Sequence, residues 1–322
     1  MIILYALAAV FITFTTLWSI GALFFDAGGL TRWGVLLSLG WVLLTLVIFF
    51  TLSPFLLALT VYTLLFAMLL GWWFSLRPSH DRDWDPNFEH LSQITMDGDA
   101  VTITNVRHTL YRSLEDYDCR WETHKLKLSD LRAADVMILF WGSDAMCHPS
   151  LTFDFGNGNH ICFSIEVRFR KNDPYHVLKG IYRQNELMYL VCDERDAILR
   201  RTKHSQGHAV YLYRLQRDQT TVQQLFEEYA DATNRIAQRP KWYNLLTSNC
   251  TTNIFWQRKG EVSWDWRMLF NGKLDELLYD WERLYQGHSF ADLKKASLIN
   301  DIANEADYEN FGHEVRVNLP GF

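Results

Sequence analysis

Hydrophobic and polar positions divide the chain into two regions. Residues 1–76 are almost entirely apolar, and one short polar loop at residues 26–32 interrupts them. The uncharged run after this loop, residues 33–76, would form a helix of about 66 Å, roughly twice the hydrocarbon core of a bilayer. It should therefore fold as two helices, and Ser53-Pro54 is the expected break. The pattern predicts three transmembrane spans, near residues 3–24, 34–52 and 55–75.

Beyond residue 76, the polar and apolar positions follow the pattern of a soluble α+β domain. Residues 148–155 and 160–170 alternate with a period of two, and the Gly156-Asn157-Gly158-Asn159 run between them is a hairpin signal. The two strands should pair antiparallel, which puts their polar side chains on one side of the sheet. These side chains are His148, Ser150, Thr152 and Asp154 on the first strand, and His160, Cys162, Ser164, Glu166, Arg168 and Arg170 on the second.

Shorter patterns predict the remaining elements. Residues 77–99 are polar and lack a period, so they are interpreted as a linker and entry loop. Apolar positions predict strands from residue 101 onward and over residues 136–141, 187–192 and 209–215. Helical spacing predicts helices over residues 220–238, 274–285 and 291–302.

The distribution of charge supports this division. The chain has 31 basic and 37 acidic residues, and only Asp26 and Arg32 lie in residues 1–76. The apolar first region excludes a fully soluble protein. A polytopic transporter is excluded as well, because most of the chain has the composition of a domain in water. The net charge of −6 gives no electrostatic reason to expect nucleic acid as a partner. A cleaved signal peptide over residues 1–25 is the alternative for the first span, but it lacks a basic start and two more spans follow.

The cysteines limit the possible chemistry. Their number is odd and no CxxC pair occurs, so at least one thiol is free and a structural zinc site of the usual spacing is not expected. A metal site assembled in space from Cys119, His124, Cys147 and His148 stays open as an alternative. The five cysteines are Cys119, Cys147, Cys162, Cys192 and Cys250.

Cys250 is the candidate nucleophile. The run from Ser248 to Asn253 has the composition of a capped helix start, and a helix N-terminus lowers the pKa of a thiol and offers N–H groups to an oxyanion. Asn249 and Thr251 are the candidate orienting or oxyanion residues. His148, at the start of a strand, is the candidate base. The third group would come from His160, Ser164 or Glu166 on the next strand, whereas in the structural alternative Cys250 is a small buried hydrophobe and His148 a surface histidine.

Eight short runs, in the same order, resemble the Lnb N-terminal periplasmic domain family over roughly residues 80–260. Members of this family are associated with bacterial lipoprotein N-acylation. The order of a histidine strand before Asn-Cys-Thr also resembles the permuted papain-like fold of lecithin-retinol acyltransferases and NlpC-type enzymes. The eight runs begin at Arg82 (RDW), Thr104 (TNVR), Tyr111 (YRS), Tyr117 (YDCRWET), His148 (HPSLTFDF), Ser164 (SIEVR), Asp193 (DERD) and Tyr243 (YNLLTSNCTTN).

The resemblance implies roles for several residues. It makes Cys250 the nucleophile and His148 the base. His160 occupies the third position of the lecithin-retinol-like pattern, twelve residues after His148, and Glu166 competes with it for that role. Four further residues that match family motifs are interpreted as a structural ion-pair network: Arg168, Asp193, Glu194 and Arg195.

The fold expected on this basis is α+β, with a three-helix membrane segment followed by a permuted papain-like, NlpC-type antiparallel sheet with helices. Residues 1–76 would be the membrane segment, residues 77–260 the thiol catalytic domain and residues 261–322 a helical extension. Arg77 and Arg82 lean slightly toward a cytoplasmic domain. The resemblance instead implies the bacterial inner membrane, with the soluble domain facing the periplasm.

The function expected is that of a membrane-anchored thiol acyltransferase. A membrane lipid would be the acyl donor and the N-terminus of a lipoprotein the acceptor, with no metal or organic cofactor. Two alternatives stay open: a papain-like hydrolase of cell-wall peptide or lipid ester, and a non-catalytic membrane-anchored module that binds lipoproteins or wall components.

Overall fold

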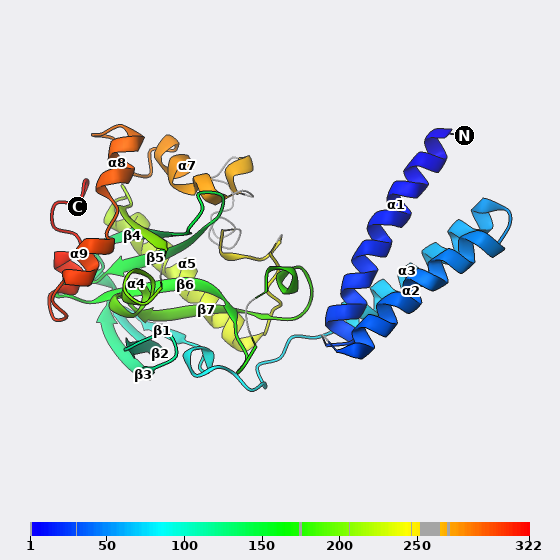
Figure 1. Cartoon of the computed structure of the whole chain (residues 1–322). Helices are drawn as coiled ribbons and strands as arrows, with labels where there is room; N and C mark the ends of the chain where they lie inside the picture. Colours follow the sequence, from blue (N-terminus) through cyan, green and yellow to red (C-terminus); the bar gives the residue numbers. More distant parts are fainter. Residues whose placement is uncertain are drawn as a thin grey trace. The chain divides into compact units, whose positions relative to one another are not determined.

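The computed structural model of the chain divides into two units, each of which is described by itself (Figure 1). The membrane unit consists of Met1–Asp81, Pro174–Glu186 and Trp242–Leu245, and the sheet unit of Arg82–Asp173, Leu187–Lys241 and Leu246–Phe322. The residues that the structure describes are 2–29, 31–173, 176–205, 207–245, 247–251, 265–268 and 271–322.

The membrane unit contains the three predicted spans. Helix α1 (Ile2–Gly21) continues into a π-helical turn η1 (Ala22–Ala27), and α2 (Arg32–Thr51) and α3 (Phe55–Ser75) follow. All three are long and apolar enough to cross a bilayer, which confirms the prediction from hydropathy. The buried Tyr62 of α3 ties the helices together, since its hydroxyl lies 2.6 Å from that of Thr15 and 2.9 Å from that of Thr16 on α1.

The sheet unit is built on one eight-stranded sheet. Its strand order is β1-β2-β7-β6-β5-β4-β8, and β3 pairs with β2 outside this path. Strand β2 lies parallel to β7, whereas the pairs β1–β2, β2–β3, β4–β5, β4–β8 and β5–β6 are antiparallel. The strands are β1 Gln93–Asp97, β2 Ala100–Tyr111, β3 Tyr117–Lys127, β4 Ala133–Trp141, β5 Cys147–Asp154, β6 His160–Arg168, β7 Glu186–Asp193 and β8 His208–Arg214.

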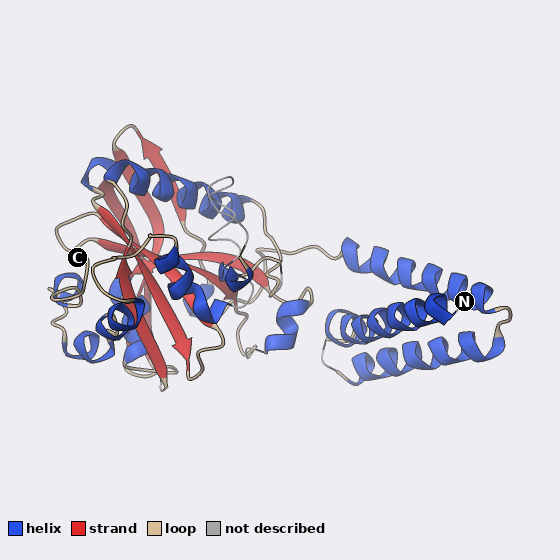
Figure 2. Cartoon of the chain, turned by 90° about the horizontal axis from the view of Figure 1, so that it is seen from above, coloured by secondary structure: helices blue, strands red, loops and turns tan. Residues whose placement is uncertain are grey.

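Helices cover both faces of this sheet (Figure 2). On one face, Phe226 of α5 (Gln219–Gln238) packs edge-on against Phe153 and Phe163 of the predicted hairpin. On the other face, the buried residues Leu190, Ile198 and Phe311 belong to one apolar cluster that joins strands to helices. The helices of this second face are α4 (Glu194–Thr202), α9 (Asn300–Glu305) and α10 (Phe311–Glu314). Helices α7 (Leu274–Asp280) and α8 (Phe290–Ala296) come before α9 in the C-terminal region. The predicted α+β class is therefore confirmed.

Three elements differ from the sequence patterns. Strand β1 falls in the segment interpreted as a linker, because only Ile94 of its five residues is buried and an edge strand of that kind has no alternation. Helix α4 was not predicted, since Ala197 and Ile198 are its only apolar buried residues and its charged side chains are paired inside the protein. The predicted helix over residues 291–302 is two helices, because the chain between α8 and α9 bonds to the edge of β8 through Ile299 N–H and Val210 C=O.

Candidate active site

The β5–β6 hairpin sets His148 opposite Glu166. The hairpin pairs Ser150 with Ser164, and the next pair on the same face in this antiparallel register is His148 with Glu166. The alternation of residues along both strands puts these four side chains on one face of the sheet. All four are buried or nearly so, because α4 and the C-terminal region cover that face.

A chain of hydrogen bonds orients the imidazole. His148 Nε2 lies 2.7 Å from Ser164 Oγ and 3.2 Å from Glu166 Oε1. Ser164 donates its hydroxyl proton to Glu166 Oε1 at 2.7 Å and accepts a bond from Ser150 Oγ at 3.1 Å. Since Ser164 gives its only proton to the carboxylate, Nε2 must donate to it. Nδ1 is therefore the ring nitrogen left for another partner.

That partner is the thiol of Cys250. The side chain of Cys250 hydrogen-bonds His148, and both residues are buried, with 8% and 6% of their surface exposed. Burial alone would lower the pKa of His148, but the Glu166 carboxylate and Cys250 outweigh it and raise the pKa to about 10. The alternative in which His148 is a surface histidine therefore does not describe this protein.

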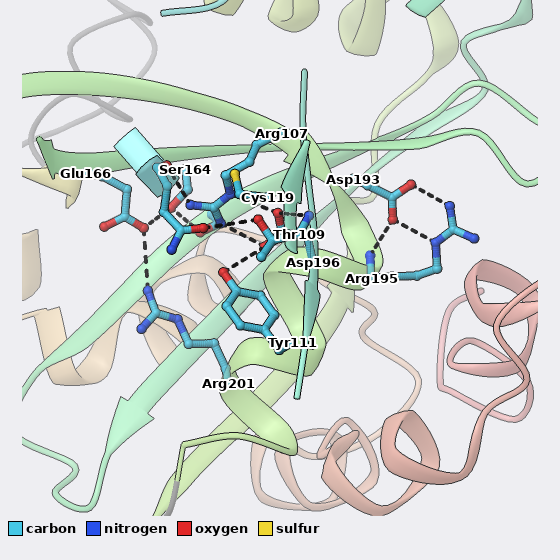
Figure 3. Close-up of polar contacts among 12 residues, drawn as sticks. Arg107, Thr109, Tyr111, Cys119, Ser164, Glu166, Asp193, Arg195, Asp196 and Arg201 are labelled. Carbon is cyan, nitrogen blue, oxygen red and sulfur yellow. Dashed lines mark hydrogen bonds and ion pairs between the residues drawn. The ribbon is translucent and has the colours of Figure 1, made fainter. Parts of the chain in front are cut away.

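Glu166 is held in its charged form. Burial would raise the pKa of this carboxyl, but His148, Arg201 and the hydroxyl of Ser164 keep it well below its ordinary value. Arg201 of α4 reaches Glu166 Oε1 at 3.6 Å, and Figure 3 shows Glu166 between Ser164 and Arg201. His148, Glu166 and Arg201 therefore form a row of groups with alternating charge, and Cys250 lies at the His148 end of this row.

His160 lies away from this row. It is six residues before Glu166 on the same strand, a separation of about 20 Å along the strand. Its Nε2 faces Asp154 at 3.6 Å, and Gly312 packs against its ring so closely that a Cβ there would lie 2.3 Å from Nδ1. Of the two candidates for the third position, the structure brings Glu166 to His148 and does not bring His160.

The residues that follow Cys250, the candidate nucleophile, are only partly described. Cys250 and Thr251 are helical, as expected for a helix start, and the rest of the predicted helix, from residue 252, lies outside the described residues. Thr251 is buried, and its hydroxyl oxygen accepts a hydrogen bond from Asn271. Asn249 is partly buried in the turn before the helix.

Asn271 joins Thr251, the neighbour of Cys250, to the strand of His148, and the sequence patterns gave no sign of it. Its Nδ2 donates to the carbonyl of Cys147 at 2.6 Å and to Thr251 Oγ1 at 2.7 Å. Its Oδ1 accepts from Cys147 N–H at 3.0 Å, and its carbonyl accepts from the Cys147 thiol at 2.9 Å. Gly272 permits this approach, because a Cβ there would lie 2.1 Å from the carbonyl oxygen of Asp144.

A second buried cluster fixes α4, which carries Arg201. Asp196 accepts two bonds from the guanidinium of Arg107, both at 2.8 Å, and one from Thr109 N–H at 3.0 Å (Figure 3). Arg107 is fully enclosed, so this pair joins α4 to β2 inside the sheet unit. The run that begins at Thr104 and the run that begins at Asp193 thus meet in one structural contact.

The four residues predicted to form one ion-pair network do not all contact one another: Asp193 and Arg195 pair, whereas Glu194 and Arg168 have other partners. Asp193 caps α4 and pairs with Arg195 at 2.7 Å, apart from the Arg107 cluster in Figure 3. Glu194 binds Arg316 of the C-terminal region, with contacts of 2.5 and 2.8 Å. Arg168 donates to the carbonyl of Phe88 and stacks on Trp84, and so it holds the chain that enters the sheet unit.

Cys147 is the neighbour that could be mistaken for the nucleophile. Burial raises its pKa well above the ordinary value, Cys250 adds to this effect, and its thiol donates to Asn271. Cys119, the other cysteine of the possible metal site, donates its thiol to the carbonyl of Pro86. Among the described residues, no group of three or more His, Cys, Asp or Glu side chains is arranged to hold a metal ion.

Comparison with known protein families identifies this domain. Residues 117–267 match the family model of the Lnb N-terminal periplasmic domain. This part of the chain is an Lnb N-terminal periplasmic domain. The expected family is thus confirmed, and the chain combines transmembrane helices with a domain of periplasmic type. No curated protein and no solved structure matches the chain.

The matched range and the hydrogen-bonded site do not coincide. His148, Glu166 and Cys250 lie inside the Lnb domain, whereas Asn271 lies four residues beyond its matched end. The N-terminal strands β1 and β2 also lie outside it. The folded unit that holds the site is therefore larger than the matched domain.

Proposed function

We propose that this protein is a membrane-anchored thiol acyltransferase in which Cys250 carries the acyl group. The observation that supports it most directly is the row formed by Cys250, His148 and Glu166, with the imidazole hydrogen-bonded on both sides. A nucleophile, a base and a group that orients the base are the parts that covalent acyl transfer needs. The resemblance to the Lnb family adds lipoprotein N-acylation as the expected reaction.

The first half-reaction forms a thioester. The thiolate of Cys250 attacks the carbonyl carbon of a lipid ester, and the negative charge moves to the carbonyl oxygen. The backbone N–H groups of Cys250 and Thr251, at the start of the helix, would bind that oxyanion. As the ester C–O bond breaks, the imidazolium of His148 gives its proton to the departing alcohol.

The second half-reaction releases the acyl group to an amine. The amine nitrogen attacks the thioester carbon, and neutral His148 accepts the proton that the nitrogen loses. The C–S bond breaks and the thiolate of Cys250 forms again beside the imidazolium. Glu166 stays ionised throughout and stabilises the imidazolium between the two steps.

The surroundings of His148 suit an apolar acyl chain. Trp141 has 42% of its surface exposed, and its ring centroid lies 6.1 Å from that of His148. An aromatic surface beside the base would favour a hydrocarbon chain over a charged peptide. The three transmembrane helices keep the domain at a membrane, where both proposed substrates are anchored.

Intact-mass spectrometry tests the proposal. The full-length protein in detergent is incubated with phospholipid, with and without a diacylated lipopeptide that has a free amino terminus. We expect a fatty-acyl adduct on the protein, and we expect the lipopeptide to remove it and gain the same mass. Cys250→Ala should form no adduct, and Cys147→Ala, which leaves the nucleophile in place, should form it normally.

The adduct measurement and a test of cellular function together separate the alternatives. An adduct that is lost only to water, with no acylated lipopeptide, would indicate a lipid-ester hydrolase. Unchanged cellular function of Cys250→Ser would contradict both thiol enzymes and indicate a binding module. An adduct that persists in Cys250→Ala would assign the nucleophile to another residue.

A further inference from the structure

Part of the chain that lies between two strands of the sheet belongs to the membrane unit. We call residues 176–185 the docking segment; it includes the short 3-10 helix η4 (Val177–Ile181) and precedes β7. Two sets of contacts bind it to the ends of the transmembrane helices. Both sets lie where α1 and α3 end, the side on which the chain leaves the last span.

The first contact uses one of the two charges in residues 1–76. The carboxylate of Asp26, just after α1, accepts bonds from Gln184 Nε2 at 2.6 Å and from Arg183 N–H at 3.3 Å. The indole N–H of Trp73 on α3 donates to the same carboxylate at 2.7 Å. The docking segment therefore helps to satisfy an acidic group at the edge of the bilayer, where an unpaired charge would be costly.

The second contact covers the end of α3. The guanidinium of Arg183 donates to the carbonyls of Phe74 and Leu76 at 3.1 and 2.6 Å, and it stacks on the ring of Trp73 at 4.2 Å. The last carbonyls of a helix have no partner within the helix, and a cation is favoured beside them. On α1, the ring of Phe25 stacks on Tyr182 with centroids 5.1 Å apart.

The docking segment has apolar side chains on its surface. Val177 and Leu178 on η4 have 49% and 50% of their surface exposed. They belong to the segment whose Arg183 stacks on Trp73, near the end of α3, and tryptophans at the ends of membrane helices favour the depth of the lipid headgroups. Exposed apolar residues of this kind, on a segment fixed to transmembrane helices, match an interfacial membrane contact.

We propose that the docking segment is a membrane-contact element that inserts Val177 and Leu178 into the lipid interface on the side of the bilayer where α1 and α3 end. The partner is the bilayer itself. The contact continues the surface of the three membrane helices, and Asp26 and Arg183 hold it there. This proposal does not depend on the acyl-transfer chemistry.

The same segment also holds the start of the nucleophile motif. Leu245 N–H donates to Gly180 C=O at 2.6 Å, and Tyr243 N–H donates to Asn185 C=O at 2.9 Å. Asn244 adds a side-chain bond to the carbonyl of Ile181 at 3.0 Å. Cys250 follows Leu245 by five residues in the chain. The docking segment therefore binds the residues that come just before the proposed nucleophile.

Depth-dependent quenching tests the contact. A genetically encoded fluorescent amino acid is placed at Leu178 of the full-length protein in phospholipid nanodiscs, and at Trp33 near the start of α2 as the matched position at the membrane edge. We expect lipids that carry a quencher near the glycerol backbone to quench both probes to a similar extent. A probe at Leu178 that these lipids leave unquenched, while the probe at Trp33 is quenched, would overturn the proposal.

A charge at the contact provides the second measurement. Leu178→Asp should reduce acyl transfer from bilayer phospholipid several-fold, while the rate at which iodoacetamide modifies Cys250 stays unchanged, because Leu178 lies outside the thiol site. Equal transfer by Leu178→Asp and the natural protein would contradict a role of the contact in substrate access. If no acyl adduct forms at all, the quenching result still decides the contact, so failure of the proposed function and failure of this inference are distinguishable.

Discussion

At the scale of single residues, the site depends on which group stands behind His148. A carboxylate at that position keeps the imidazole protonated, whereas a neutral second histidine would carry no negative charge to do so. Burial works against a charged His148, and Glu166 and Cys250 overcome that effect. The resting site should therefore hold an imidazolium whose proton is ready for the departing alcohol.

The pH dependence of the proposed reaction follows from this state. With a raised pKa of about 10, His148 is protonated at neutral pH and loses its proton only as the pH rises through that value. We expect the formation rate of the acyl-enzyme to fall on the alkaline side near pH 10. Glu166→Gln removes the carboxylate that raises the pKa, so the fall should move toward about pH 6.5, the ordinary imidazole value. Ser164→Ala, which keeps the carboxylate, should move it less.

The five thiols should differ strongly in reactivity. Burial raises the pKa of Cys147, and a hydrogen bond with Cys162 together with burial raises the pKa of Cys192, whereas Cys250 has an imidazolium beside it. Iodoacetamide should therefore modify Cys250 faster than Cys162 at pH 7, as peptide mass mapping after timed labelling would show. Equal rates would argue against an activated thiol, and a loss of activity in Cys147→Ala would make Cys147 the better candidate.

At the scale of elements, the hairpin explains both what the sequence could predict and what it could not. The alternation in residues 148–155 and 160–170 identified the strands and the shared polar face. It left His160 and Glu166 as equal candidates, because alternation alone does not give the register. The turn did contain that information: Phe155 pairs with Asn159 across it, and counting outward from this pair sets His148 opposite Glu166.

Asn271 could not be predicted in the same way. It is 124 residues from Cys147 and 20 from Thr251, and no spacing rule connects an asparagine in a short 3-10 turn with either residue. Helix α4 was missed for a related reason, because its partners Arg107 and Arg316 come from distant parts of the chain. Local patterns predict elements well when one face is apolar and poorly when buried charges take its place.

Asn271 should act as a positioning residue. Asn271→Ala removes the bonds that join Thr251 to the strand of His148, so we expect kcat of the proposed reaction to fall about 10- to 100-fold with little change in KM. Asn304→Ala is the matched control, since Asn304 is an exposed asparagine of the same C-terminal region. A KM that rises with an unchanged kcat would instead indicate contact with substrate.

At the scale of the whole molecule, the C-terminal region completes the sheet unit. Phe311, Val315 and Leu319 belong to the apolar cluster on one face of the sheet. Arg316 reaches the fully buried Asp135 on β4 as well as Glu194 on α4. The region beyond the Lnb domain is therefore part of the core that supports the row of Cys250, His148 and Glu166.

Loss of Arg316 should be costly for stability. Arg316→Leu leaves Glu194 buried without its cation, and an uncompensated buried charge typically costs about 3–5 kcal/mol. We expect a clearly lower thermal unfolding midpoint for the full-length protein in detergent. Glu194→Gln in the same chain should recover part of the loss, because it removes the stranded charge. If the double variant is no more stable than Arg316→Leu, the pair is not the source of the effect.

The bond between Glu194 and Arg316 also has a consequence in time. Arg316 is 122 residues later in the chain, and at about 5–20 residues per second a ribosome needs roughly 6–24 s to add that stretch. If α4 packed against the sheet during this interval, the carboxylate of Glu194 would be buried before Arg316 had been synthesised. The sheet can therefore close over α4 only after nearly the whole chain has been made, by which time the three membrane helices at the other end have long been synthesised. We therefore expect the membrane helices to insert into the bilayer first and the thiol site to assemble late in folding.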